Sequence, residues 1–133
     1  MGEMTQHPVE LIVLKQVASY LATPVFLVDP DGNLLYYNEP AEPILGLRFD
    51  ETGEMPVSEW STVFVPEHED GTPMPAETLP LVIALHERRP AHASFHITGL
   101  DGTRRAIAVT GFPLIAQSGE NLGAVALFWM EDA

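Results

Sequence analysis

The sequence contains no cysteine and few basic residues. The missing cysteines exclude disulfide frameworks, thiolate nucleophiles, cysteine-based zinc sites and iron–sulfur clusters, and they favour a reducing compartment such as the cytoplasm. Lys and Arg together number 6 against 19 Asp and Glu, so the formal net charge is −13. Phosphate backbones and anionic lipid repel such a chain, and we therefore expect neither a nucleic-acid nor a membrane-surface role.

Long apolar runs are also missing. No run approaches the roughly 18 residues that a membrane span needs, and Met1-Gly2-Glu3 lacks the basic start of a secretory signal. Yet 46% of the 133 residues are hydrophobic, which is too many for a disordered acidic tail. The length corresponds to one domain that buries about two-thirds of its unfolded surface. We expect a soluble cytoplasmic domain.

Residues 8–21 have the pattern of an amphipathic helix, which Thr23-Pro24 stops. One apolar stripe can seat the helix on the domain, and a second lies beside it. We expect the second stripe to form a homodimer interface, since two-fold homodimers are the commonest oligomers. The alternative is that both stripes pack within one domain, or that the helix crosses the open face of its own sheet. The seating stripe comprises Leu11, Leu14, Ala18 and Leu21, and the interface stripe comprises Val9, Ile12, Val13 and Tyr20.

Short strands separated by turns make up most of the remaining chain. Asp31-Gly32 and Asp101-Gly102 are strong hairpin signals, and the final three strands follow one another so closely that they must be antiparallel. The pattern predicts an α+β domain with a five-stranded antiparallel sheet and helices on one face. The expected strands cover 25–28, 34–37, 91–97, 105–112 and 122–130, and the expected helical segments cover 8–21, 58–61 and 76–88.

Asn38 follows the second expected strand and precedes a segment interrupted by Pro40 and Pro43. An asparagine side chain is a favoured helix N-cap, and Gly46 suits the end of the same helical segment. We expect one or two irregular turns between them. As a cap, the Asn38 side chain would contribute about 0.5–2 kcal/mol to stability.

Three segments carry turn residues in a characteristic order. The first is VFLVDPDGNLLYYN at residues 25–38, the second is DGTPMPAETLPL at 70–81, and the third begins with DGTRR at 101–105. Together they resemble the PAS domain family: its opening hairpin with an Asp-x-Asp-Gly turn and closing Asn, the loop and long helix of many bacterial sensory PAS domains, and its last two strands. The resemblance implies a sensory or interaction module of bacterial signal transduction and not an enzyme.

The resemblance also implies a division of the chain into a flanking helix in residues 1–23 and a sensor domain in residues 24–133. It also implies that rearrangement of a dimer relays the signal to an effector domain or to a signalling protein. Family members often continue from the last strand into an Asp-Ile-Thr segment, where this sequence reads Met130-Glu131-Asp132-Ala133.

The usual ligand site of the family is a cavity between the sheet and its helices, and an apolar cavity of this kind suits a small apolar ligand. The sequence alone does not separate such a cavity from a filled core. The residues expected to surround it are Phe26, Tyr37, Trp60, Leu81, Leu85, Phe95, Ile107, Val109 and Phe128.

Histidine is the first candidate for cofactor chemistry. His86 falls on the helix that carries the iron ligand in haem-binding PAS sensors, but its neighbours are strongly polar and fit an exposed last turn. His92 and His96 lie about 13 Å apart along their strand, too far to share a metal ion. The acidic segment 67–70 fits a solvated loop. Without cysteine, the PAS photoreceptors that bond a flavin or cinnamoyl group are excluded. We expect no metal and no haem; the sequence leaves the cofactor unknown and favours none.

Two further functions stay open. One is a haem-binding gas sensor that uses His86. The other is a small pocketed α+β enzyme of the ketosteroid-isomerase type, which needs a carboxylate base facing an apolar cavity. The paired carboxylates of Asp29 and Asp31 fit a tight turn better than acid–base catalysis. No nucleophile elbow, phosphate-binding loop or dinucleotide fingerprint is present. A third interpretation is a protein–protein interaction module with a collapsed core.

Overall fold

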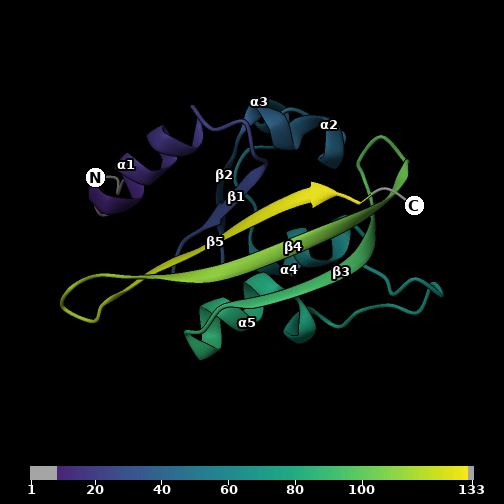
Figure 1. Cartoon of the computed structure of the whole chain (residues 1–133). Helices are drawn as coiled ribbons and strands as arrows, with labels where there is room; N and C mark the ends of the chain where they lie inside the picture. Colours follow the sequence, from purple (N-terminus) through teal and green to yellow (C-terminus); the bar gives the residue numbers. More distant parts are fainter. Residues whose placement is uncertain (1–8, 132–133) are drawn as a thin grey trace.

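The computed structural model describes residues 9–131. Its centre is one antiparallel sheet with the strand order β2-β1-β5-β4-β3 (Figure 1). The five-stranded α+β fold predicted from the hairpin turns is thus confirmed. The strands are β1 (Val25–Val28), β2 (Leu34–Tyr37), β3 (Ala91–Thr98), β4 (Arg104–Ile115) and β5 (Asn121–Met130).

Helices cover both faces of the sheet. In Figure 1, α1 lies on one side of the sheet, and α4 and α5 lie on the other. The side chains between the sheet and α4 and α5 form an inner core, and those between the sheet and α1 form a smaller outer core. The helices are α1 (Val9–Ala18), α2 (Glu42–Leu45), α3 (Phe49–Thr52), α4 (Val57–Val63) and α5 (Pro80–Glu87), with 3₁₀ turns η1 (Glu39–Ala41) and η2 (Ala76–Thr78).

Helix α1 lies against the outer face of its own sheet, as one of the alternatives to the dimer interface has it, while the residues of the interface stripe stay exposed. Leu11 and Ala18 are buried there in one cluster with Leu27 and Val125. Leu21 does not help to seat the helix, because α1 ends at Ala18 and leaves the Leu21 side chain exposed. Residue 8, where the expected helix begins, lies outside the described residues.

The prediction that Asn38 caps a helix is wrong. Its side chain makes no capping hydrogen bond, because Pro40 has no N–H to offer and the Ala41 N–H already donates to the backbone carbonyl of Asn38 at 3.0 Å. Instead, Asn38 is fully buried, and its side chain joins three backbone segments. Its Oδ1 accepts from the Val25 N–H at 2.9 Å, and its Nδ2 donates to the carbonyls of Ala18 and Thr23, each at 2.9 Å. Asn38 therefore fastens the end of α1 to the start of β1.

The helix expected over residues 76–88 is divided. Leu79 adopts an extended conformation between η2 and α5, with φ −74° and ψ 137°. A residue before proline is disfavoured in the helical region, and Pro80 follows Leu79 directly. Gly46, by contrast, ends α2 with a φ of 91°, in the left-handed conformation predicted for it.

An ion pair ties the β3–β4 turn to α2. The Arg105 guanidinium makes two hydrogen bonds to the Asp101 carboxylate, at 2.7 Å and 3.1 Å, and a third to the carbonyl of Ile44 at 2.9 Å. The hydrogen bonds from Arg105 and from the Thr103 N–H lower the pKa of Asp101 from its usual 3.8 to about 2. The ionised carboxylate is therefore favoured by the folded state.

We expect this pair to produce a pH-dependent contribution to stability that Asp101→Asn removes. Because the pKa of Asp101 is lower in the folded chain, its contribution is complete above about pH 4 and is lost as the pH falls toward 2. Urea unfolding of both proteins from pH 6 to pH 2 measures the effect. The free energy of unfolding of the wild type should be larger than that of the variant at pH 6, and this difference should shrink as the pH falls to 2. A difference that stays constant with pH would show that the substitution acts through something other than the carboxylate charge.

Candidate functional site

An apolar cavity of about 80 Å³ lies inside the inner core. Strands β1, β3, β4 and β5 form one wall of the cavity, and α2, α4, the following loop and the start of α5 form the other. All of the residues around it are buried. They are Phe26, Leu45, Trp60, Phe64, Pro66, Leu79, Pro80, Leu81, Phe95, Ile97, Ile107, Val109, Ala126 and Phe128.

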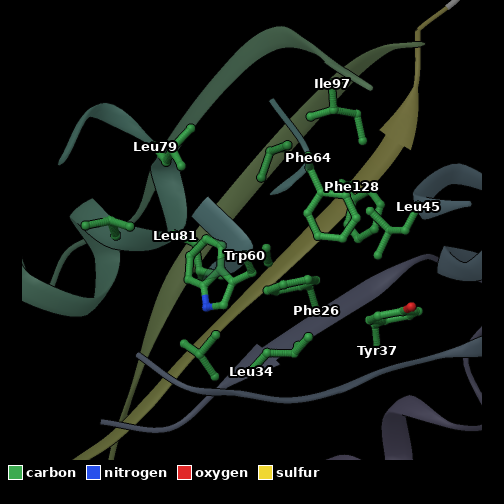
Figure 2. Close-up of a cluster of buried hydrophobic side chains, with 14 of the residues drawn as sticks. Phe26, Leu34, Tyr37, Leu45, Trp60, Phe64, Leu79, Leu81, Ile97 and Phe128 are labelled. Atoms are coloured by element: carbon green, nitrogen blue, oxygen red, sulfur yellow. The ribbon is translucent and has the colours of Figure 1, made fainter. Parts of the chain in front are cut away.

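Aromatic rings make up one side of this cavity. Figure 2 shows Phe26 lying between Trp60 and Tyr37. The Phe26 ring stacks parallel to Tyr37 at 6.1 Å and meets Trp60 edge-on at 5.3 Å. Such offset and edge-to-face pairs hold rings in fixed orientations. This side of the cavity is therefore built from rings that constrain one another.

Close contacts with the hairpin and the sheet fix the two helices beside the cavity. The Trp60 indole N–H on α4 donates to the carbonyl of Gly32 at 2.7 Å, in the turn between β1 and β2. At the other helix, Pro80 lies so close to Gly111 of β4 that a Cβ on Gly111 would come within 2.9 Å of its carbonyl. Both contacts are between parts of the chain far apart in sequence, so the cavity depends on the complete fold.

The structure brings most of the expected site residues together around the cavity. Tyr37 and Leu85 are the two that do not line it, although both belong to the inner core. The Tyr37 hydroxyl instead donates to the carbonyl of Leu47 at 2.8 Å, with Thr52 Oγ1 at 3.2 Å. The expected residues that do line it are Phe26, Trp60, Leu81, Phe95, Ile107, Val109 and Phe128.

Sequence reasoning missed several lining residues. Ile97 and Ala126 share a strand face with Phe95 and Phe128, so strand alternation could have identified them. The others lie in turns or at helix ends, where no periodic pattern marks the inward side. They are Leu45, Phe64, Pro66, Leu79 and Pro80.

The histidines on β3 and α5 lie away from the cavity. His86, the expected haem ligand of the gas-sensor alternative, is exposed on α5. His92 and His96 alternate along β3 with Phe95 and Ile97, so they point to the opposite face of the sheet. Within residues 9–131, no group of three or more histidine, aspartate or glutamate side chains is placed to hold a metal ion.

The carboxylates of the first hairpin serve its turn. The Asp29 carboxylate, which is buried, accepts hydrogen bonds from the backbone N–H groups of Asp31 and Asn33 and from the Asn33 side chain. It does not line the cavity. The ketosteroid-isomerase alternative requires a carboxylate facing the cavity, and no acidic residue is among those that surround it.

A continuous row of rings leads from the cavity to α1. From Phe26 the row passes through Tyr37 to Phe49, whose rings lie 5.3 Å apart, and from Phe49 to Tyr36 at 5.4 Å. The Lys15 ammonium of α1 lies 5.4 Å from the centre of the Tyr36 ring, in cation–π range. The cavity and α1 are thus in contact through packed side chains as well as through Asn38.

The sequence profile described as PAS fold matches residues 20–130, which is most of the chain. The chain belongs to the PAS fold family. Its members are typically sensory modules of signal transduction and not catalysts, and PAS domains commonly dimerise and link to effector domains. None of the curated proteins matches this PAS domain. Helices in the described part of the chain are all too short or too polar to span a bilayer.

Solved structures show the same fold at low sequence identity. The PAS domain of Bordetella pertussis BvgS has 18% identity and a TM-score of 0.68, over 95% of this chain and 89% of that one. The Rhodobacter sphaeroides LOV protein has 9% identity and a TM-score of 0.70, over 94% and 69%. The light-state dimer of the fungal blue-light photoreceptor Vivid has 12% identity and a TM-score of 0.62, over 96% and 97%. At these identities, the likeness concerns the fold alone.

Proposed function

We propose that this PAS domain is a cytoplasmic sensor that binds a small molecule in the inner-core cavity and relays binding through α1 to a homodimer interface. The flanking segment in this proposal is residues 1–23, and the sensor is residues 24–133. The observation that carries the proposal is the Asn38 side chain. Its hydrogen bonds join Ala18 of α1 to Val25, the neighbour of the cavity residue Phe26.

The Asn38 connection allows a change at the cavity to reach α1 and a change at α1 to reach the cavity. A ligand that displaces Phe26 disturbs the Val25 N–H that Asn38 holds, and it also disturbs the rings that lead to Lys15. A ligand shifts a conformational equilibrium only by its difference in affinity for the two states. Here the two states would differ in how α1 is seated on the sheet, since Asn38 contacts both elements.

The proposed dimer surface is the outward face of α1 together with Tyr20, which follows the end of the helix at Ala18. The expected interface residues are all exposed, although each of them is apolar or aromatic. Single exposed apolar residues are ordinary, but contiguous ones usually mark a contact. The exposed fractions are 70% for Val9, 56% for Ile12, 50% for Val13 and 78% for Tyr20.

We expect Ile12→Glu combined with Val13→Glu to convert a dimer into a monomer. Two buried carboxylates in an apolar interface carry a large desolvation cost, and they add to the repulsion between two chains of net charge −13. Light scattering at micromolar concentration should give about twice 14.6 kDa for the wild type and 14.6 kDa for the double variant. Native mass spectrometry of the freshly purified wild type would also detect any retained small molecule by the mass that it adds to the protein.

A matched control separates the interface from added charge in general. Ser58→Glu with Thr103→Glu adds the same charge at two exposed positions, one on α4 across the sheet from α1 and one in the β3–β4 turn, and should leave the dimer intact. A monomeric wild type, or a double variant in α1 that remains dimeric, would remove this helix from the interface.

A further inference from the structure

The walls of the cavity offer a ligand nothing to hydrogen-bond. Every residue that lines it is apolar, apart from the single indole N–H of Trp60. That N–H already donates to the carbonyl of Gly32 at 2.7 Å. Burying a polar group without a partner is costly, whereas an apolar ligand leaves no polar group unpaired on entering such a cavity. The lining therefore selects against any ligand that carries a hydroxyl, amide or carboxylate.

Haem and flavin do not fit these residues. Haem needs an iron ligand and cationic or polar partners for its propionates, and the described histidines on α5 and β3 do not line the cavity. The polar edge of a flavin ring needs donors and acceptors, which the lining lacks. Both groups are also far larger than about 80 Å³.

The helix side of the cavity is anchored, so any enlargement of the cavity has to come from the sheet side, where Phe26 lies. Helix α4 is held through Trp60, and α5 is held where Pro80 meets Gly111. The loop between these helices is also fastened, because Glu67 exchanges two backbone hydrogen bonds with His96, at 2.8 Å and 2.9 Å. An engineered protein cavity of about 150 Å³ accepts benzene or xenon. At about 80 Å³, this cavity admits a smaller molecule as it stands and a single ring only if the wall yields.

We propose that the ligand of this sensor is an uncharged hydrocarbon-like molecule no larger than one benzene ring, with no hydrogen-bonding group. The inference rests on the proposed function and names the chemical class that its site accepts. A short aliphatic chain or an apolar gas fills the cavity directly. A benzene ring must displace the aromatic wall at Phe26, which is the residue next to the Asn38 connection to α1.

Binding of four probes tests this class. Xenon, benzene, phenol and benzoate are titrated into wild-type protein labelled at its methyl groups, and NMR shifts identify the residues that respond. Xenon and benzene should bind saturably, with shifts at Ile97, Ile107 and Val109. Phenol should bind at least ten-fold more weakly than benzene, because one lost hydrogen bond costs about 1.4 kcal/mol or more. Benzoate, haemin and flavin mononucleotide should not bind in the cavity.

Two variants locate the site. Ala126→Leu fills the cavity and should abolish xenon binding, and Val109→Ile is a milder filling variant that should weaken it if Ala126→Leu does not fold. Ala106→Leu on the opposite face of β4 is the control and should bind xenon as the wild type does. Saturable xenon binding without benzene binding would support the same apolar ligand class and would show that the wall at Phe26 does not move to admit a ring.

The outcomes distinguish this inference from the proposed function. Equal affinity for benzene and benzoate, binding of haemin or flavin in the cavity, or no response to xenon and benzene would overturn the ligand class. If a polar molecule binds there and changes the dimer, the sensor function stands and the ligand class fails. If the apolar probes bind and neither the dimer nor α1 responds, the ligand class stands and the relay fails.

Discussion

Replacing Gly123 by alanine is expected to lower the free energy of unfolding by about 3–6 kcal/mol, through strain and a steric collision together. Gly123 lies in β5 with a φ of +127°, a conformation that residues with a Cβ rarely adopt. A Cβ at this position would lie 2.1 Å from the carbonyl oxygen of Val28, in the neighbouring strand β1. Neither atom can move without separating β1 from β5. Urea unfolding followed by circular dichroism measures the loss.

Gly119→Ala is the matched control for this prediction. Gly119 has a φ of +91° in the β4–β5 turn, but nothing lies within 4 Å of a Cβ placed there. Alanine at Gly119 should therefore cost only the backbone strain, about 1–3 kcal/mol. If both substitutions cost the same, the contact between Gly123 and Val28 contributes nothing, and the expected large effect is wrong.

Asn38→Ala is expected to cost about 3–5 kcal/mol, well beyond the loss of a helix cap. The substitution leaves the buried Val25 N–H unpaired, which costs about 1–3 kcal/mol. It also removes one hydrogen bond from the Ala18 carbonyl, which keeps the bond from the Leu21 N–H, and one from the carbonyl of the exposed Thr23, at about 0.5–1.5 kcal/mol each. It also frees α1 from β1. Chemical unfolding gives the loss in stability, and limited proteolysis should show faster cleavage in residues 19–24 of the variant.

Asn33→Ala provides the comparison. Its side chain makes one hydrogen bond, to Asp29 at 3.2 Å, in a half-buried turn, so the expected loss is below about 1.5 kcal/mol, with cleavage at 19–24 unchanged. A loss of 2 kcal/mol or less for Asn38→Ala, without faster cleavage, would show that Asn38 does not anchor α1.

The hairpins could be predicted because their signals are local. Asp31-Gly32 and Asp101-Gly102 place glycine where the turn needs a positive φ, and the structure has φ of 89° at Gly32 and 83° at Gly102. The alternation of β3 likewise identifies Phe95 as an inward residue from the sequence alone. Elements whose geometry is decided within a few residues were therefore predictable.

Other features depend on partners distant in sequence. The local sequence predicts that Asn38 caps a helix, but its side chain instead donates a hydrogen bond to the carbonyl of Ala18, twenty residues earlier. Helix α3 has 4 residues and α4 has 7, too short for an apolar period to show. The position of Trp60 follows from its bond to Gly32, 28 residues away. The cavity is the space that side chains from several elements leave unfilled, so no single segment of the sequence encodes its volume.

The order of the strands also determines when the domain can fold. Strand β5 is the last in sequence, yet it lies in the middle of the sheet, between β1 and β4. Until β5 is synthesised, the β1–β2 and β3–β4 hairpins have no strand to join them, and Phe26 and Phe128 cannot meet across the cavity. Pairing between distant segments closes slowly, typically in milliseconds to seconds. A nascent chain that stops before Asn121 therefore has neither a closed sheet nor the complete outer core on which α1 docks. Its aromatic residues stay exposed, where they can bind chaperones or aggregate.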